Sequence, residues 1–326
     1  MKVAINGFGR IGRQVFKRAL EKGVKIVAIN DLTDTETLAY LLNHDSVYGK
    51  SEKKIIAGEG FIKIGFKKII VFAEKDPANL PWKKLGVDFV VESTGFFTDR
   101  ENAKKHLDAG AKKVLISAPS PDADITVVLG VNEGELKKEH KIISLASCTT
   151  NCAAPIIKIL NDEFGIEKGF ITTVHAYTGD QRLLDSPHKK LRRGRSAVIN
   201  LVPTTSGAAT AVVQTIPELK GKLDGMAIRS PVACGSITDF SLNLNKSVTS
   251  EEVNKAIQEK SKKIKEFLEY SEDELVSSDI IGNSHSSIFD SKLTRANGKM
   301  VKVFSWYDNE HGYSCRMVDM LKKVLK

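Results

Sequence analysis

Residues 2–31 read KVAINGFGRIGRQVFKRALEKGVKIVAIND, and this stretch decides the fold of the first half of the chain. Its pattern predicts a strand over residues 2–6, a glycine turn, an amphipathic helix and a second strand that ends at Asp31. In the turn, Gly7 permits the tight bend, Gly9 lets the backbone approach a pyrophosphate, and Gly12 lets the helix pack close to the strand. A glycine-rich turn without a ligand is the alternative. The flanking strands, the helix and an acid about 20 residues beyond the glycines favour a dinucleotide site.

Asp31 predicts which dinucleotide binds. A carboxylate at the end of the second strand accepts hydrogen bonds from the adenosine ribose diol and repels a 2′-phosphate. The sequence therefore favours NAD, with NADP as a weaker alternative. An exposed acid that only caps the turn at residues 30–34 is the other interpretation.

Strand and helix patterns alternate through the rest of this half. Strand patterns recur at residues 68–72, 87–94 and 112–120, with a helical pattern over residues 98–111. The alternation predicts an α/β fold with a doubly wound, mostly parallel sheet. Hydroxyl groups at residues 93–94 and at Ser117 follow strands, at the edge where such sheets bind ligands, although ordinary turn chemistry also explains them.

The composition of the whole chain narrows the class of protein. A length of 326 residues predicts two domains. No apolar run approaches the roughly 20 residues of a membrane span, and the four cysteines are too few and too scattered for a disulfide framework, so we expect a cytoplasmic enzyme. The net charge of +9 is spread along the chain and favours small anionic ligands. A nucleic-acid-binding protein is the alternative that rests on this charge, and its binding would weaken steeply with salt.

The stretch ASCTTNC, residues 146–152, lies between a strand pattern and a helical pattern. Cys148 is the candidate nucleophile, because the first amide groups of a helix favour a negative charge such as a thiolate. Cys152, one turn further on, is predicted to be a small core residue. A zinc site is disfavoured because no second close Cys/His pair exists. Pro155 predicts an interruption or kink in the helix.

Residues 170–197 contain further candidates for catalysis and for ligand binding. His175 ends an apolar run, and within reach of Cys148 it could lower the thiol pKa from about 8.5 and shuttle protons. Phosphate-binding chemistry is supplied by a set of arginines, hydroxyls and a glycine: Arg192, Arg193, Arg195, Arg229, Thr178, Thr205, Ser206 and Gly207. A solvated or nucleic-acid-binding basic run is the alternative for KKLRRGR.

Several motifs together resemble the phosphorylating glyceraldehyde-3-phosphate dehydrogenase family. They occur in that family's order and cover nearly the whole chain: NGFGRIGR, ASCTTNC, TTVHAYT, PHKKLRRGRSA, SGAATAV, PELKGKLDGMAIR and WYDNEHGYS. The resemblance implies an NAD-binding Rossmann domain over residues 1–147 and an α/β catalytic domain with a mostly antiparallel sheet over residues 148–309. It also implies a C-terminal helix, residues 310–326, that returns to the first domain, and a homotetramer.

The resemblance further implies a glycolytic reaction, the NAD-dependent oxidative phosphorylation of D-glyceraldehyde 3-phosphate to 1,3-bisphosphoglycerate. Cys148 would form a hemithioacetal and then a thioester, with His175 as the base. Erythrose-4-phosphate dehydrogenase is the alternative. The implied cofactor residues are Gly7, Gly9, Arg10, Ile11, Gly12, Asp31, Lys75, Ser117 and Asn309. The implied substrate residues are Ser147, Thr149, Thr178, Arg193, Ser206, Gly207 and Arg229, and no metal is expected.

The chain departs from the family pattern at several positions. Ser206 stands where the family usually has Thr, which keeps the hydroxyl. Cys234 and Cys315 stand where Asn is expected, and His311 replaces an aromatic residue. The dipeptide at residues 186–187 half-resembles NADP-tolerant relatives, which weakens the preference for NAD without reversing it.

Overall fold

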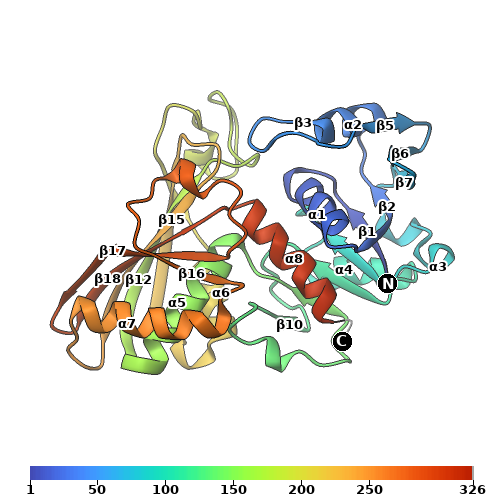
Figure 1. Cartoon of the computed structure of the whole chain (residues 1–326). Helices are drawn as coiled ribbons and strands as arrows, with labels where there is room; N and C mark the ends of the chain where they lie inside the picture. Colours follow the sequence, from blue (N-terminus) through green and yellow to red (C-terminus); the bar gives the residue numbers. More distant parts are fainter. Residues whose placement is uncertain (325–326) are drawn as a thin grey trace. The chain divides into compact units, whose positions relative to one another are not determined.

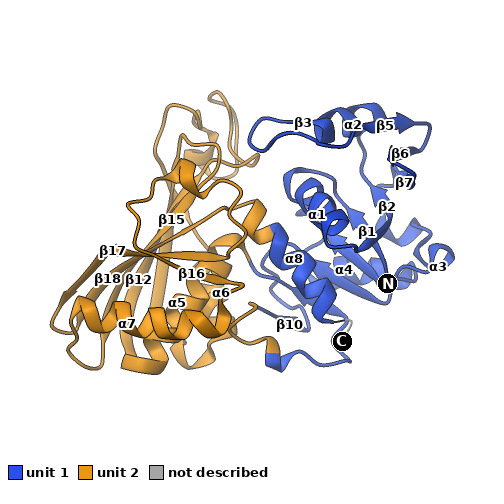
Figure 2. Cartoon of the chain, in the orientation of Figure 1, with its two compact units in different colours: residues 1–127, 134–146, 314–326 blue, residues 128–133, 147–313 orange. Residues whose placement is uncertain are grey.

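The computed structural model describes residues 1–324. Two compact units make up the chain (Figure 2): unit 1 contains residues 1–127 and 134–146 and the chain from Ser314 onward, and unit 2 contains residues 128–133 and 147–313. Helix α8 (His311–Lys323) starts in unit 2 and continues in unit 1. Within residues 1–324, no helix is both long and apolar enough to cross a membrane.

Unit 1 is built on a nine-stranded sheet with the order β10-β11-β9-β8-β1-β2-β7-β6-β5 (Figure 1). Strands β10 through β7 of this order pair in parallel, and β7, β6 and β5 form an antiparallel edge. The strands are β1 (Lys2–Asn6), β2 (Lys25–Asn30), β5 (Ile55–Gly58), β6 (Phe61–Ile64), β7 (Lys67–Phe72), β8 (Phe89–Glu92), β9 (Lys113–Ile116), β10 (Ile125–Thr126) and β11 (Ile142–Ser144), with a separate hairpin of β3 (His44–Asp45) and β4 (Gly49–Lys50). The helices are α1 (Arg10–Glu21), α2 (Thr35–Asn43), α3 (Trp82–Leu85), α4 (Arg100–Asp108) and the 3-10 turn η1 (Pro77–Asn79).

The central strands of this sheet are apolar because both of their faces are covered. Val3 and Ile5 on β1, Ile29 on β2 and Val91 on β8 are completely buried. Continuous apolar strands of this kind are typical of parallel sheets with helices on both faces. The predicted doubly wound, mostly parallel sheet is confirmed.

Unit 2 contains a seven-stranded sheet with the order β13-β14-β12-β15-β18-β17-β16. Most neighbours are antiparallel, with parallel pairs only at β12/β14 and β16/β17 among the described strands. The strands are β12 (Ile166–Ala176), β13 (Val202–Thr205), β14 (Leu223–Ser230), β15 (Ser236–Leu244), β16 (Leu268–Ser271), β17 (Ser287–Asn297) and β18 (Met300–Tyr307). The helices are α5 (Cys148–Phe164), α6 (Ala208–Thr215) and α7 (Ser250–Ser261), with 3-10 turns η3 (Leu191–Gly194), η4 (Pro217–Leu219), η5 (Lys262–Ile264) and η6 (Ser277–Ile280); η2 (Glu133–Glu135) lies at the boundary between the units in sequence. The predicted mostly antiparallel second sheet is confirmed as well.

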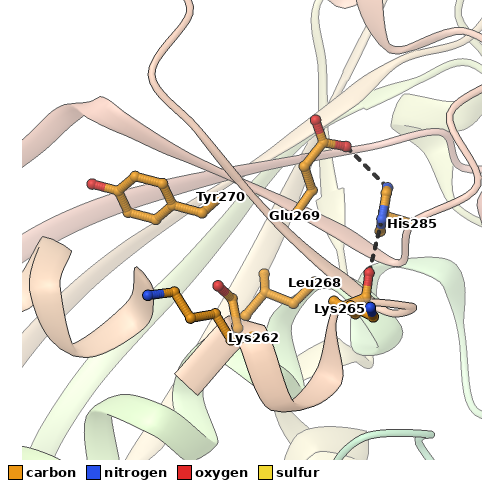
Figure 3. A pocket seen from close by; sticks show the side chains of 7 residues that line it. Lys262, Lys265, Leu268, Glu269, Tyr270 and His285 are labelled. Atoms are coloured by element: carbon orange, nitrogen blue, oxygen red, sulfur yellow. Dashed lines mark hydrogen bonds and ion pairs between the residues drawn. The ribbon is translucent and has the colours of Figure 1, made fainter. Parts of the chain in front are cut away.

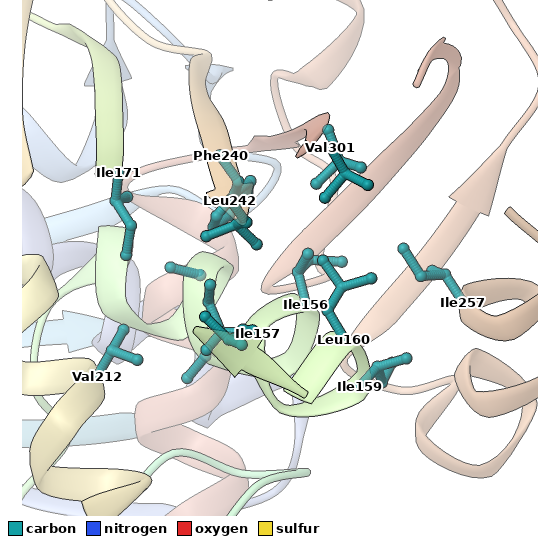
Figure 4. Close-up of a cluster of buried hydrophobic side chains, with 14 of the residues drawn as sticks. Ile156, Ile157, Ile159, Leu160, Ile171, Val212, Phe240, Leu242, Ile257 and Val301 are labelled. Carbon is teal, nitrogen blue, oxygen red and sulfur yellow. The ribbon is translucent and has the colours of Figure 1, made fainter. Parts of the chain in front are cut away.

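The core of unit 2 fixes the position of α5. Ile156, Ile157 and Leu160 of this helix pack in one cluster with Ile171 of β12 and Phe240 of β15 (Figure 4). All five side chains are buried, and full burial of such a side chain is worth about 1.5–3 kcal/mol. This cluster therefore holds the N-terminus of α5, where Cys148 lies, in a defined place.

Pro155 does not interrupt α5. The helix runs without a break from Cys148 to Phe164, so the predicted interruption is wrong, while a kink at Pro155 stays a prediction. Pro155 has no N–H to donate to the carbonyl four residues earlier, which costs one helical hydrogen bond. The buried side chains before and after Pro155 keep the helix continuous despite that loss.

Candidate active site and cofactor site

The glycine turn between β1 and α1 needs glycine for two different reasons. Gly7 has a φ of +88°, and a Cβ built on it would lie 2.6 Å from the backbone nitrogen of Thr94. A Cβ on Gly12 would overlap the carbonyl oxygen of Gly7. A Cβ on Gly9, in contrast, would have no neighbour within 4 Å. Gly7 and Gly12 are thus required by packing, while Gly9 leaves the open surface that a pyrophosphate needs.

Asp31 is tied to this turn by its carboxylate. Oδ2 accepts a hydrogen bond from the backbone N–H of Phe8 at 2.6 Å, and Oδ1 accepts one from Thr33 at 2.9 Å. The bond to Thr33 is the turn cap expected from the alternative interpretation, but the bond to Phe8 reaches 23 residues back to the glycine turn. An ionised carboxylate accepts about four hydrogen bonds, so each oxygen keeps capacity for a ribose hydroxyl.

Arg10, the first residue of α1, is held by an acid that the sequence analysis missed. Its Nη1 donates to Asp45 Oδ1 at 3.0 Å, and its guanidinium lies 5.7 Å from the centre of the Tyr48 ring. Asp45 also accepts from Gln14 at 3.1 Å. Its carboxylate is almost fully buried, a property that no local pattern of the sequence reveals.

The other predicted cofactor residues occupy different surroundings. Ile11 and Ser117 are half-buried, at the start of α1 and just after β9, and Lys75 is exposed after β7. Asn309 belongs to unit 2 and is buried, with its Oδ1 accepting a hydrogen bond from Ser236 at 2.9 Å.

Cys148 is the first residue of α5, in the strand-to-helix turn that the sequence predicts. Ser147 is the N-cap, and its Oγ accepts from the backbone N–H of Thr150 at 3.1 Å. The residue before the cap, Ala146, has a φ of +51°, the only positive value for a non-glycine residue in the described chain. Cys148 is half-buried, whereas Cys152 is fully buried and lies 3.7 Å from the hydroxyl of Ser287. The predicted location of Cys152 in the core agrees with the structure.

The structure brings Cys148 and His175 together. The Sγ atom lies 3.4 Å from Nε2 of His175, the penultimate residue of β12. On the other side of the ring, Nδ1 lies 2.6 Å from the carbonyl oxygen of Ala176. A carbonyl only accepts hydrogen bonds, and this is the shorter of the two polar contacts of Nδ1, so it favours the tautomer with the proton on Nδ1 and the lone pair of Nε2 facing the thiol. Nη1 of Arg229 also lies 2.9 Å from Nδ1 and 3.2 Å from the same carbonyl, to which it donates.

Burial and charge set the protonation of this pair. Burial lowers the pKa of His175 to about 3, and the positive charge of Arg229 contributes in the same direction, so the imidazole is neutral at pH 7. Burial also raises the pKa of the Cys148 thiol, while Arg229 and hydrogen bonds from Thr149 oppose that rise. The charge that lowers the thiol pKa therefore comes from Arg229. A lowering of the thiol pKa by His175 stays a prediction.

Tyr307 completes this site and was missed by the sequence analysis. Its hydroxyl lies 2.8 Å from the hydroxyls of both Thr149 and Thr173, and its ring packs edge-on to the His175 imidazole at 5.9 Å. The side chain is buried. Its place in the WYDNEHGYS motif is the only signal in the sequence that could have pointed to it.

The predicted phosphate-binding residues form two groups in unit 2. In the first, Nη1 of Arg229 lies 3.4 Å from Oγ1 of Thr178. In the second, Arg193 donates from Nε to Thr204 at 3.0 Å, and its Nη1 is paired with Asp180. Burial lowers the pKa of Arg229, and the positive charge of Arg193 is the next largest cause. Two cations that repel each other in this way favour the binding of anions between them.

Ser206 and Gly207 lie at the start of α6. The Ser206 hydroxyl accepts from the backbone N–H of Ala208 at 3.2 Å, and Gly207 is the N-cap residue. The structure thus places both residues at a helix N-terminus, although their contact with phosphate stays a prediction.

One pocket lies outside this site. A surface pocket is lined by Ser261, Lys262, Lys265, Leu268, Glu269, Tyr270 and His285 (Figure 3). None of the predicted site residues lines it. The four cysteines form no disulfide, and no group of His, Cys, Asp and Glu in residues 1–324 has the arrangement of a metal site.

A dinucleotide turn and a Cys–His pair in one chain define an NAD-dependent oxidoreductase that works through a cysteine thiol. Comparison with known families gives the particular family. Residues 1–100 match the model of the glyceraldehyde 3-phosphate dehydrogenase NAD binding domain, and residues 147–309 match that of the C-terminal domain. The chain belongs to the glyceraldehyde-3-phosphate dehydrogenase family, as its motifs predicted, and NAD is confirmed as its cofactor.

Curated relatives of this family are similar over their full length. The chain is 57% identical to glyceraldehyde-3-phosphate dehydrogenase of Thermotoga maritima over 330 residues, which cover 100% of this chain and 99% of the relative. It is 55% identical to the Geobacillus stearothermophilus protein of the same name, with 98% and 97% covered. For the protein of this name from Borreliella burgdorferi the identity is 53%, and both chains are covered completely.

Proposed function

We propose that the chain oxidises D-glyceraldehyde 3-phosphate with NAD and inorganic phosphate to 1,3-bisphosphoglycerate. The contact of 3.4 Å between Cys148 Sγ and His175 Nε2 is the observation that carries the proposal. Erythrose 4-phosphate is the second candidate substrate. We place it behind glyceraldehyde 3-phosphate because the three relatives compared above carry the glyceraldehyde name.

Cys148 and His175 carry out the first chemical step. The neutral Nε2 of His175 accepts the thiol proton as Sγ of Cys148 attacks the aldehyde carbon. The oxygen of the substrate aldehyde then takes up this proton, which gives a hemithioacetal. The backbone N–H of Cys148, at the start of α5, is free of helical partners and stabilises the developing oxyanion.

Oxidation leaves an acyl group on the same sulfur. NAD supplies the hydride acceptor when it is bound, and its fit rests on the open surface at Gly9 and the spare acceptor capacity of Asp31. His175 takes the hydroxyl proton of the hemithioacetal, so a thioester remains on Cys148. The Nδ1–H bond to Ala176 keeps the imidazole in the orientation that this proton transfer requires.

Two anion-binding groups fit a phosphate acceptor. Thr178 and Arg229 would hold the phosphate of the substrate, with Ser147 and Thr149 beside the reacting carbon. Arg193, Ser206 and Gly207 would hold inorganic phosphate as it attacks the thioester, which breaks the C–S bond and returns the thiolate. Arginine suits both places because its planar fork donates two parallel hydrogen bonds to a phosphate.

The cofactor residues and the wider organisation follow the family in this proposal. Gly7, Gly9, Arg10, Ile11, Gly12, Asp31, Lys75, Ser117 and Asn309 contact NAD. The functional domains are residues 1–147 for NAD, residues 148–309 for catalysis, and the C-terminal helix 310–326, of which residues 325–326 lie outside the described part. We further propose a cytoplasmic homotetramer, and the reduced state of the four cysteines suits a reducing compartment.

The decisive experiment removes phosphate. Without it, NADH should appear as a burst of up to one equivalent per active subunit and then nearly stop, and added phosphate should restore turnover. Arg193→Leu should impair that recovery more than the burst. Arg295→Leu, which removes an exposed arginine of β17 that donates to the backbone carbonyls of Lys292 and Thr294, is the matched control and should leave both unchanged. Turnover at the full rate without phosphate would mean that water releases the product, and the proposal would be wrong.

A further inference from the structure

Ser236 links the catalytic strand to a proposed cofactor residue through one hydroxyl group. It is the first residue of β15, the strand between β12 and β18, and it is completely buried. Its Oγ accepts a hydrogen bond from the backbone N–H of Ala176 at 3.1 Å. The same Oγ donates to Oδ1 of Asn309 at 2.9 Å.

The single proton of this hydroxyl orients the Asn309 amide. A serine hydroxyl has one hydrogen to donate, and here it points at a side-chain oxygen. An asparagine amide has an oxygen on one side and an NH₂ group on the other. With Oδ1 turned toward Ser236, the two N–H donors of Nδ2 face away from it. The serine therefore decides whether Asn309 offers donors or an acceptor to a ligand.

The other bond of the hydroxyl reaches the catalytic base. The backbone N–H of Ala176 donates to Ser236, and the carbonyl oxygen of Ala176 lies 2.6 Å from Nδ1 of His175. A shift of the Ala176 peptide would move this acceptor and weaken the preference for the tautomer in which Nε2 faces Cys148. One hydroxyl thus supports both the base and the Asn309 amide.

The neighbours of Ser236 leave it little freedom to move. Gly235 has a φ of +87°, and a Cβ on it would overlap the carbonyl oxygen of Ser277. Cys234 donates from its thiol to Asp308 at 3.2 Å, next to the bond between Ser236 and Asn309. Cys234 and Ser236 are thereby attached to two successive residues, Asp308 and Asn309.

We propose that Ser236 is a positioning residue that turns the Nδ2 donors of Asn309 toward a hydrogen-bond acceptor of NAD and steadies the Ala176 carbonyl that orients His175. The proposal rests on the proposed function, because it needs Asn309 to contact NAD. The two hydrogen bonds of Ser236 have different consequences. Loss of the bond to Asn309 weakens NAD binding, and loss of the bond to Ala176 slows the proton transfer by His175.

The test is a double-mutant cycle with Ser236→Ala and Asn309→Ala, read as KM for NAD, KM for the aldehyde and kcat. Ser236→Ala should raise KM for NAD about three- to tenfold, as expected for one hydrogen bond, and change KM for the aldehyde less than about twofold. In the Asn309→Ala background, Ser236→Ala should change KM for NAD less than about twofold while still lowering kcat. Ser241→Ala, which removes a half-buried hydroxyl from the same strand, should change none of these values.

Failure of the proposed function and failure of the positioning role give different results. An unaltered enzyme without NAD-dependent turnover would refute the proposed function before the cycle begins. With an active parent, an unchanged KM for NAD in Ser236→Ala, or an equal rise in both backgrounds, would overturn the positioning role. If Ser236→Ala fails to fold, Ser236→Cys takes its place, because its thiol is a weaker donor and should give a smaller change of the same kind. An unchanged KM for NAD in a folded Ser236→Cys would then overturn it.

Discussion

The backbone N–H of Phe8 donates to Asp31 Oδ2 at 2.6 Å, so the acid predicted to select the cofactor also fastens the glycine turn. Here a change at Asp31 affects the binding of the ribose and the order of the turn that receives the pyrophosphate.

Asp31→Gly should therefore raise the use of NADP relative to NAD but lower the efficiency with NAD by about tenfold or more. The variant removes the repulsion of a 2′-phosphate, the ribose contact and the bond to Phe8, and hydrogen bonds to a charged group are worth about 1.5–3 kcal/mol each. The measurement is kcat/KM for both cofactors. Asp34→Asn is the control, because Asp34 caps the neighbouring helix α2 and does not touch the turn. An unchanged cofactor ratio in Asp31→Gly would reduce Asp31 to a turn residue.

Cys148→Ser should abolish oxidation, whereas Cys152→Ser should keep most of it. A serine hydroxyl stays protonated at neutral pH and is a poor nucleophile. Cys152 is fully buried, and burial raises its thiol pKa to about 12, so it supplies no thiolate. Steady-state rates and the stoichiometry of iodoacetamide labelling check both variants, with one labelled cysteine expected in the parent and none in Cys148→Ser. Similar losses of activity in both variants would contradict the assignment of Cys148 as the sole nucleophile.

Arg229→Gln should shift the alkylation of Cys148 to higher pH. The guanidinium is the largest cause that lowers the Cys148 pKa, so its removal raises that pKa and leaves less thiolate at any given pH. The midpoint of the iodoacetamide rate against pH should therefore move upward. This readout needs no substrate, so it is independent of any loss of phosphate binding. Arg295→Gln on β17 is the control, and a midpoint equal to the parent's in Arg229→Gln would show that its charge does not reach the thiol.

The sequence predicts those parts of the molecule that depend on neighbouring residues. The turn at Gly7, the helix that starts at Cys148 and the strand that ends at His175 each follow from patterns within a dozen residues. The contact between Cys148 and His175 joins residues 27 apart, and the sequence alone does not establish it; the structure makes it, with α5 leading directly into β12.

The remaining parts depend on segments that are distant in sequence. Tyr307 reaches Thr149 across 158 residues, and Asp45 reaches Arg10 across 35. Each is a buried polar side chain whose partners are set by strand order, which no local periodicity encodes. Pro155 shows the converse case, because tertiary burial overrides a local rule and the helix stays continuous.

Cys234→Ala should destabilise the chain by about 1–3 kcal/mol, while Cys234→Asn should cost less. The thiol donates to the Asp308 carboxylate, which also accepts the backbone N–H groups of Glu310 and His311 where α8 begins. Alanine removes a donor from a buried carboxylate, whereas asparagine, the residue that the family pattern leads one to expect here, supplies an N–H. Urea unfolding measures the difference. A loss below about 0.5 kcal/mol in Cys234→Ala would mean that the thiol only fills space.

Tyr307→Phe should lower kcat and stability together, because one hydroxyl serves two buried threonines. Without it, the hydroxyls of Thr149 and Thr173 both lose their shared partner, and an unsatisfied buried polar group costs about 1–3 kcal/mol. Thr149 follows the nucleophile directly, so its release loosens the start of α5, while the edge-on contact of the ring with His175 is retained. We therefore expect kcat to fall several-fold with little change in KM for NAD. Tyr270→Phe is the matched control: Tyr270 stacks on Phe289 in the same unit, away from the site, and its loss should leave kcat unchanged. A variant Tyr307→Phe with full kcat and a normal unfolding midpoint would show that the two threonines find other partners and that the hydroxyl has no part in holding the nucleophile.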